Sequence, residues 1–436
     1  MIVSDVRDWL NEKRTSTDML VREITFDACT PWGLAAGRLT RPDGRYFSVV
    51  LRDGLYIDQS EIGLLSIIVM ESAGEVLVVV HAKEEPGNVG MVQLAPTVQA
   101  TESNYLRIHG GEATPLFAEA HPESTPGVVL SDSLQSEHGS RFWKKRNRNV
   151  MISMIEPPPV STNLAIARLD DLLDAMFDDY VVNTDARSVL AATPWRHLVP
   201  RGSVPFSRGR APEDMGLARS FASRESQFDD AIAMLERLRS SQEAWRLGMP
   251  EEPICDIATS SDLRNGQQEI RFVEVSSSRR EVTTWRQPLY YDREEDIQTL
   301  ITREATEGTK VLLRARHETG LLSGVEFGLS LSKRDSTGHD LAADDGVQQW
   351  LTHAVQSGTV RARVMQSEEG GRFMDARCAY SVVEIFEKGP TNRAAQEAFD
   401  RSFIWVNLRT LNELACTPLT TTNELRSGVS LLLAWL

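Results

Sequence analysis

The sequence of 436 residues lacks the short motifs that mark the commonest enzyme chemistries. It contains no GxGxxG fingerprint after an apolar strand and no GxxxxGK(S/T) loop, so neither a dinucleotide-binding fold nor a P-loop is supported. It has no HExxH helix, and its eight histidines show no spacing typical of metal ligands. A GxSxG nucleophile elbow is also absent. Hydride-transfer, ATP-driven and zinc chemistry are therefore disfavoured.

Cysteine is scarce, and its four copies (Cys29, Cys255, Cys378 and Cys416) form no CxxC pair. This scarcity argues against a disulfide framework or a zinc knuckle and is typical of a reducing compartment. No apolar run is long enough to span a bilayer. The first twenty residues contain acidic side chains but no apolar core of a signal peptide. We therefore expect a cytoplasmic protein that does not enter a membrane.

Positive charge is outnumbered, with 47 Lys and Arg against 62 Asp and Glu and a net charge of −15. Such acidity argues against general binding of nucleic acid or anionic membranes. One segment is an exception, because "RFWKKRNRN" (141–149) contains five basic residues and no acidic one. A charge run is usually a solvated strand edge or helix face. The alternative is a local clamp for an anionic ligand, since Arg forks suit phosphate oxygens.

The sequence contains an internal repeat. "QSEHGSRF" (135–142) returns as "QSEEGGRF" (366–373), and "VLVVVHAKEEPGNVGMVQL" (76–94) returns as "VLLRARHETGLLSGVEF" (311–327). "NTDARSVL" near residue 183 returns loosely as "NELRSGVS" near 423. Nearly constant offsets predict two copies of one fold unit. We assign residues 1–196 to the first repeat, 197–214 to an exposed linker rich in Pro, Gly, Ser and Arg, and 215–436 to the second repeat.

Within each repeat, helical and strand patterns are mixed. Apolar spacing predicts helices at 6–14 and 225–247, and further helices at "LDDLLDAMF" and "LRTLNELA". "RYFSVV", "IRFVEV" and the run 76–80 are typical of strands. The fold class is therefore predicted to be α+β.

Two long stretches resemble the NDP-hexose 2,3-dehydratases of deoxysugar biosynthesis. They are "EPGNVGMVQLAPTVQATESNYLRIHGG" (85–111) and "SLQSEHGSRFWKKRNRN" (133–149), supported by "GRYFSVV" (44–50), "EVTTWRQPL" (281–289) and "SEEGGRF" (367–373). The resemblance runs from about residue 6 to the C-terminus. It implies a Nudix-like unit in each repeat, a homodimer, no cofactor, and a nucleotide-sugar site in each half, only one of them catalytic. No Nudix box with its Glu-rich helix is visible, which disfavours a metal-dependent hydrolase.

The resemblance also implies a substrate, dTDP-4-keto-6-deoxyglucose, whose chemistry follows from its bonds. The C4 ketone acidifies the proton on C3, so a base removes that proton, donors stabilise the enolate, and a general acid helps the C2 hydroxyl to leave. The enol product becomes a 3,4-diketo-2,6-dideoxy sugar. No nicotinamide is consumed, which agrees with the missing fingerprint. The product would pass to a downstream NADPH-dependent 3-ketoreductase, in deoxysugar and antibiotic biosynthesis.

The polar loop after the apolar run 76–80 is the predicted sugar site of the first repeat. We expect Gly87 and Gly90 to allow close approach of backbone to ligand. The candidate ligands and catalytic groups are polar residues of this loop and of the basic run. The catalytic candidates are Glu85, Glu102, Tyr105 and His109, and the substrate ligands are Gln99, Thr101, Ser103, Asn104, Arg107, Arg141, Lys144, Arg146 and Arg148.

A second site is expected in the second repeat, formed by Trp285, Gln287, Glu369 and Arg372, with Trp285 stacked on thymine. Its loop differs from that of the first repeat, so this site is expected to be degenerate. Each assignment has a structural alternative. Glu85 before Pro86 suits a turn, His109 before two glycines suits a strand end, and Trp285 suits a buried strand. A non-catalytic nucleotide-sugar-binding homologue and an Mg²⁺-dependent Nudix hydrolase remain as other functions.

Overall fold

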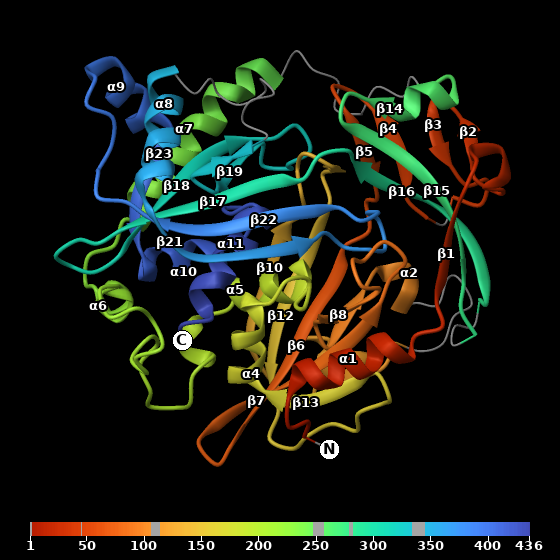
Figure 1. Cartoon of the computed structure of the whole chain (residues 1–436), viewed down its shortest axis with the longest axis horizontal. Coiled ribbons are helices and arrows are strands. Elements are labelled where there is room, and N and C mark those ends of the chain that lie inside the picture. The colour runs from red at the N-terminus through yellow and green to blue at the C-terminus, as the bar shows by residue number, and fades with distance from the viewer. Residues whose placement is uncertain (1, 45, 106–113, 247–256, 279–281, 334–344) are drawn as a thin grey trace.

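The computed structural model describes the chain except residues 1, 45, 106–113, 247–256, 279–281 and 334–344 (Figure 1). It is a mixed α+β structure, as the sequence predicts. The described strands form two larger sheets and two smaller ones (Figure 1). None of the described helices combines the length and the apolar character needed to cross a membrane.

The two larger sheets have the same strand order. In each, a central strand pairs in parallel with one neighbour and antiparallel with the other. The first contains β10 (Val128–Ser136), β12 (Arg146–Ser153), β6 (Gly63–Ser72), β7 (Glu75–Glu84) and β13 (Leu164–Arg168), with β8 (Val92–Ala95) beside β7 and β9 (Val98–Ala100) beside β6. The second contains β21 (Thr359–Ser367), β22 (Arg377–Glu384), β17 (Asp296–Arg303), β18 (Lys310–His317) and β19 (Val325–Gly328), with β20 (Leu331–Ser332) beside β17 and β23 (Phe403–Asn407) beside β18.

Details of the two sheets also repeat. Thr97 accepts from the Ile68 amide at 3.0 Å in the first sheet, and Ser330 accepts from the Ile301 amide at 2.9 Å in the second. The edge strands β10 and β21 carry register shifts at corresponding positions, after residues 129 and 360. Central strands rich in Val, Ile and Leu are buried on both faces. These features agree with the duplication read from the sequence.

The helices cover the sheets and meet between them. α5 (Thr184–Ala191) and α11 (Asn423–Leu433) pack on each other, and Arg426 of α11 donates to the Ser188 hydroxyl at 2.7 Å. The helices expected at 6–14 and 225–247 are close to α1 (Val6–Ser16) and α7 (Phe228–Arg246). The others are α2 (Glu102–Tyr105), α3 (Phe117–Ala120), α4 (Leu169–Asp174), α6 (Leu217–Ala222), α8 (Asp345–Ser357), α9 (Arg393–Ser402) and α10 (Leu408–Cys416).

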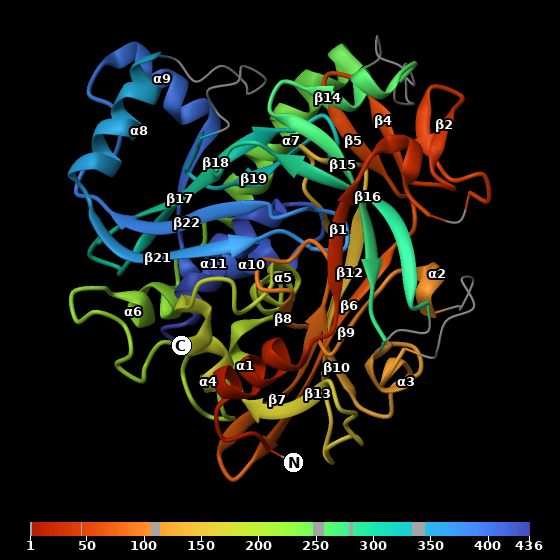
Figure 2. The same cartoon turned by 45° about the vertical axis from the view of Figure 1, so that its right-hand side comes forward.

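One of the two smaller sheets joins the two halves of the chain. One contains β1 (Leu20–Ile24), β15 (Gln268–Ser276), β14 (Arg264–Asn265) and β16 (Thr284–Asp292), and the other contains β11 (Phe142–Trp143), β5 (Leu55–Asp58), β4 (Ser48–Leu51), β3 (Arg38–Thr40) and β2 (Gly33–Ala35). β1 comes from the start of the chain, yet it pairs antiparallel with β15, as Figure 2 shows. The halves are therefore interleaved, and residues far apart in sequence share one surface.

Two glycines lock the halves together reciprocally. Gly87 donates its amide to the Gly370 carbonyl at 2.8 Å, and Gly320 donates to the Gly139 carbonyl at the same distance. A Cβ at Gly87 would lie 1.6 Å from the Phe373 carbonyl oxygen. The close approach expected of Gly87 therefore exists, but its partner is the backbone of the other half rather than a ligand.

The segment expected to be an exposed linker is only partly so. Residues 201–204 are exposed, whereas Leu198, Val199 and Pro200 before them are buried. Phe206 is buried too, with its ring centroid 5.8 Å from that of Trp195. The segment therefore contributes apolar contacts to the main core.

Candidate active site

A pocket of about 260 Å³ is lined by both halves of the chain. The first half contributes polar groups at the ends of β7 and β9, on β12 and at the start of α5, and the second half contributes β16 and the loop after β21. The polar lining residues are Gln59, Lys83, Glu84, Glu85, Gln99, Thr101, Glu137, Lys145, Asn147 and Asp185 from the first half, and Trp285, Gln287, Glu369 and Arg372 from the second.

The pocket brings together residues that the sequence assigned to two different sites. Glu85, Gln99 and Thr101 were expected in the first repeat's site, and they line the pocket. All four residues expected to form a second site (Trp285, Gln287, Glu369 and Arg372) line the same pocket. The interleaving of the halves causes this, because β16 lies across from the ends of β7 and β9. The structure thus merges the two expected sites into one.

The remaining loop residues lie outside this lining. Ser103 is buried and donates to a Glu61 carboxylate oxygen at 2.9 Å, and Glu102 is exposed. The Tyr105 ring is stacked on Phe117 with the centroids 4.6 Å apart. Arg107 and His109 lie outside the described residues, as does the side chain of Asn104. Their assigned roles stay predictions.

The basic run does not converge on one point. Arg148 pairs with Asp132 at 2.7 Å on the sheet surface, whereas Arg141 is buried and pairs with Asp292 at 2.5 Å. Lys144 lies 5.3 Å from the Trp143 ring centroid, and Arg146 is half-buried on β12. Alternate residues of a strand face opposite sides, which separates these side chains. Among the basic residues of the run, Lys145 lines the pocket.

Hydrogen bonds hold pocket residues of the second half in place. Arg372 donates to the Gln59 side-chain oxygen at 3.2 and 3.3 Å, so its guanidinium is held at the pocket wall. Gln287 donates to the Gly371 carbonyl at 3.0 Å, and the Trp285 indole donates to Gln287 at 2.8 Å. The rigid Arg fork and the indole face are suited to an anionic group and a planar ring.

Lys145 and Lys83 add positive charge to the pocket. Lys83 pairs with Glu85 at 2.9 Å. Lys145 is buried and donates to the Glu61 carbonyl. Burial lowers the pKa of Lys145 to about 8. The ammonium is therefore a poised hydrogen-bond and proton donor near neutral pH.

Three carboxyl groups face this charge. Glu137 accepts from the Asn423 side chain at 2.9 Å and from the Asn147 side chain, and burial raises its pKa. Asp185, in the first turn of α5, has no hydrogen-bond or ion-pair partner among the described residues, and neither does the Glu369 carboxylate. Burial, and then Glu137 and Glu369, raise the pKa of Asp185 well above its ordinary value. Two neighbouring carboxyls with raised pKa values, here Glu137 and Asp185, are typical of acid–base sites.

A second cavity, of about 500 Å³, lies at the related position of the other half. The relation follows from matching hydrogen bonds, because the Ile57 amide donates to the Arg141 carbonyl and the Tyr290 amide donates to the Arg372 carbonyl, each at 2.8 Å. By the repeated motifs, Glu368 corresponds to Glu137, Glu424 to Asp185 and His138 to Glu369.

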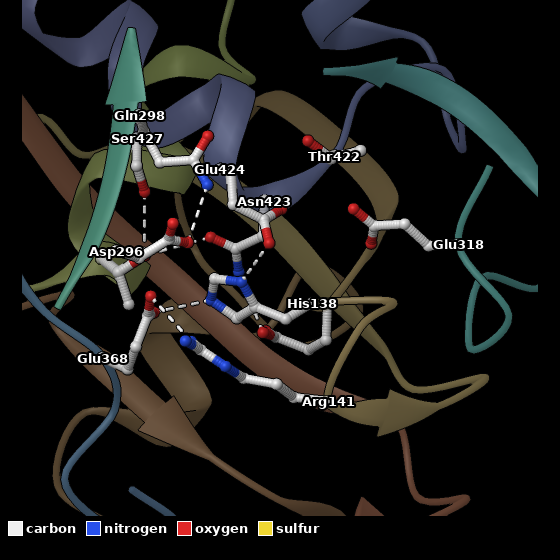
Figure 3. Close-up of polar contacts among 12 residues, drawn as sticks. His138, Arg141, Asp296, Gln298, Glu318, Glu368, Thr422, Asn423, Glu424 and Ser427 are labelled. Atoms are coloured by element: carbon white, nitrogen blue, oxygen red, sulfur yellow. Dashed lines mark hydrogen bonds and ion pairs between the residues drawn. The ribbon is translucent and has the colours of Figure 1, made fainter. Parts of the chain in front are cut away.

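His138 changes the chemistry behind this second cavity, where it contacts Glu424 of the cavity lining (Figure 3). Its ring nitrogens lie 2.7 Å from a Glu368 oxygen and 2.8 Å from a Glu424 oxygen. Burial disfavours the imidazolium, but the two carboxylates outweigh it and raise the pKa of His138 well above its ordinary value. In the first pocket no side chain of the described residues bridges the corresponding carboxyls, whereas here His138 pairs with two of them. The position of Lys145 is occupied by Ala376. The counterpart of the first pocket's carboxyl cluster is therefore a closed, buried ion network that reaches the second cavity through Glu424.

Seven polar pocket residues were not among the site residues predicted from the sequence, namely Gln59, Lys83, Glu84, Glu137, Lys145, Asn147 and Asp185. Two signals were present in the sequence. Glu137 and Asp185 lie inside the repeated blocks, and comparing the copies position by position shows that His138 replaces the Glu369 carboxylate. Lys145 belongs to the basic run, but the side of the sheet to which its side chain points depends on how β12 pairs with its neighbours.

Comparison with known proteins identifies the family of the chain. A family model described as NDP-hexose 2,3-dehydratase matches residues 56–193 and 257–432. The chain is 29% identical over 433 residues to a dTDP-4-dehydro-6-deoxy-alpha-D-glucopyranose 2,3-dehydratase of Saccharopolyspora spinosa, covering 93% of this chain and 86% of the relative. Proteins of the same name from Amycolatopsis orientalis (29% over 444 residues, covering 95% and 90%) and Streptomyces violaceoruber (29% over 377 residues, covering 80% and 80%) also match.

Proposed function

The chain belongs to the NDP-hexose 2,3-dehydratase family and is a hydro-lyase, and we propose that it removes water from C2 and C3 of dTDP-4-keto-6-deoxyglucose. The observation that carries this proposal is the pocket between the halves. It places cations, unpaired carboxyls and an indole on one surface. A ketosugar nucleotide needs an anion ligand, an acid–base pair and a surface for its base.

The pocket residues divide by chemistry. Arg372 suits the diphosphate, because its hydrogen bonds to Gln59 fix the charged guanidinium at the pocket wall. Trp285 suits the thymine face. Gln99 suits a sugar oxygen, because its buried amide nitrogen has no partner among the described residues. Glu369 is the proposed base for the C3 proton, and the Lys145 ammonium is the proposed donor to the C4 enolate.

The loop after β9 is proposed to complete this site. Thr101 already lines the pocket and directly precedes α2. From that loop, Ser103, Asn104 and Arg107 are proposed as substrate ligands, and Glu102, Tyr105 and His109 as catalytic groups.

Three further expectations are part of the proposal. Each repeat, 1–196 and 215–436, is proposed to be a Nudix-like unit, which the matching strand orders support. The chain is proposed to act as a homodimer. Its diketo product is proposed to pass to an NADPH-dependent 3-ketoreductase in antibiotic deoxysugar biosynthesis, because a 3,4-diketo sugar is too reactive to accumulate.

The experiment is incubation of the protein with dTDP-4-keto-6-deoxyglucose, a 3-ketoreductase and NADPH. We expect NADPH oxidation that depends on the protein, and a product lighter than substrate by one water after allowance for the added hydride. Calorimetry should show that dTDP binds and thymidine binds far more weakly. Release of nucleoside monophosphate that requires Mg²⁺ would instead identify a hydrolase. Tight dTDP binding without turnover would identify a binding protein.

A further inference from the structure

We propose that Asp185 is the general acid that protonates the departing C2 oxygen in this dehydration. The inference rests on the proposed function, and it assigns a role to a residue that the loop and clamp motifs did not include. It follows from a comparison of the two halves, in which corresponding carboxyl groups have different partners.

Asp185 and Glu424 occupy related places, each in the first turn of a buried helix behind a capping residue. Glu424 is ion-paired to His138 at 2.8 Å. Asp185 is 3% exposed, lines the pocket and has no partner among the described residues. A buried carboxylate without a partner is costly, so such a group keeps its proton or is retained for a function. Because Asp185 lines an open pocket, we infer that it keeps its proton and that a ligand in the pocket can receive that proton.

The charges around Asp185 favour its protonated form. Glu137 and Glu369, from the loops after β10 and β21, and Glu85, after β7, are negative, while Lys83 on β7 is the cation among the groups that act on it. Burial acts in the same direction and raises the pKa of Asp185 well above its ordinary value. Glu137 is less suited to donate, because both its oxygens already accept from amide groups.

The proposed step balances. A base takes the C3 proton, and the electrons of that bond form the enolate that the C4 ketone accepts. As the C2=C3 bond forms, the C2–O bond breaks with both electrons on oxygen, and Asp185 supplies the proton that completes water. During tautomerisation the C3 hydroxyl returns a proton to the Asp185 carboxylate and the base returns its proton to C2. Water and the diketo sugar are the only products.

The test compares Asp185→Asn with its counterpart Glu424→Gln. We expect Asp185→Asn to lose about a hundred-fold or more in kcat, to bind dTDP within a few-fold of the wild type, and to fold. Asp185→Glu, which keeps a protonatable group, should retain more turnover than Asp185→Asn. Turnover of Asp185→Asn within threefold of the wild type would overturn the inference.

Stability against pH separates an acid from a merely structural residue. Because the folded pKa of Asp185 lies above the unfolded value of about 4, its contribution to stability is full below pH ~4 and is lost as pH rises through the folded pKa. Asp185→Asn should therefore melt higher than the wild type above neutral pH. Glu424→Gln should melt lower, since it leaves His138 with one carboxylate. A lower melting temperature for Asp185→Asn at alkaline pH would contradict the proposal.

Failure of the inference is distinguishable from failure of the proposed function. If the wild type itself does not dehydrate the ketosugar, both are wrong. If the wild type is active and Asp185→Asn is equally active, the function stands and another group supplies the proton.

Discussion

Replacing Gly87 with alanine is expected to prevent the chain from reaching a stable native state. The new Cβ would lie 1.6 Å from the Phe373 carbonyl oxygen and 2.7 Å from its carbonyl carbon. Both are backbone atoms of the opposite half, held there by the bond from Gly87 to Gly370. Overlap with backbone has no cheap relaxation, so the cost should exceed about 4 kcal/mol, at the top of the range for single substitutions.

Denaturant unfolding of the purified variant, or its loss from the soluble fraction, measures this effect. Gly90→Ala is the matched control in the same loop. Gly90 has φ +76°, but its added Cβ would meet only the Arg14 side chain, at 3.4 Å. Alanine there should cost about 1–2 kcal/mol for the left-handed backbone. Equal stabilities of the two variants would show that the contact between the halves is looser than described.

Replacing Lys145 with methionine is expected to reduce kcat/KM by about a hundred-fold or more, because one preorganised donor to the developing enolate is lost. Methionine matches the length and apolar stem of lysine, so the buried site is filled. Lys310→Met is the control. Lys310 is also a buried lysine, but it lies on β18 away from the pocket and faces Glu225 at 3.9 Å. Its variant should keep turnover per folded molecule.

The pH dependence of kcat/KM should show that the protonated ammonium of Lys145 is the active form. Its pKa is about 8, so kcat/KM of the wild type should fall as pH rises through about 8, where the free enzyme loses that proton. The residual activity of Lys145→Met should not show this fall near pH 8, and any descending limb left in the variant should belong to the Asp185 acid. A fall of the same size and midpoint in the variant as in the wild type would assign it to another group and remove Lys145 from the role of donor.

The duplication could be predicted from the sequence because short contiguous motifs of the first half recur in the second half. The motif around Gly139 returns around Gly370, and each copy folds into the same strand–loop–strand unit. Helical spacing likewise placed α1 and α7. These features depend on neighbours in sequence, which is what a pattern records.

The composition of the site could not be predicted in the same way. Trp285 and Glu369 belong to the second repeat by sequence, and long-range contacts between the halves, among them the pairing of β1 with β15 and the bond from Gly87 to Gly370, bring both residues to the first repeat's pocket. The direction in which each side chain of the basic run points also depends on the tertiary structure. Lys144 adopts a positive φ of 52° before β12, and this turn sets which of its neighbours points inward.

The central claim is that catalysis occurs in the pocket lined by Glu369 and Asp185 and not in the second cavity. Coupled turnover of dTDP-4-keto-6-deoxyglucose by Glu369→Gln, measured beside Glu318→Gln, tests it most directly. Glu369 lines the shared pocket, and Glu318 lines the second cavity. We predict that Glu369→Gln loses about a hundred-fold or more in kcat while still binding dTDP, and that Glu318→Gln stays close to the wild type. Loss of turnover in Glu318→Gln with Glu369→Gln unaffected would place the chemistry in the second cavity and contradict the account.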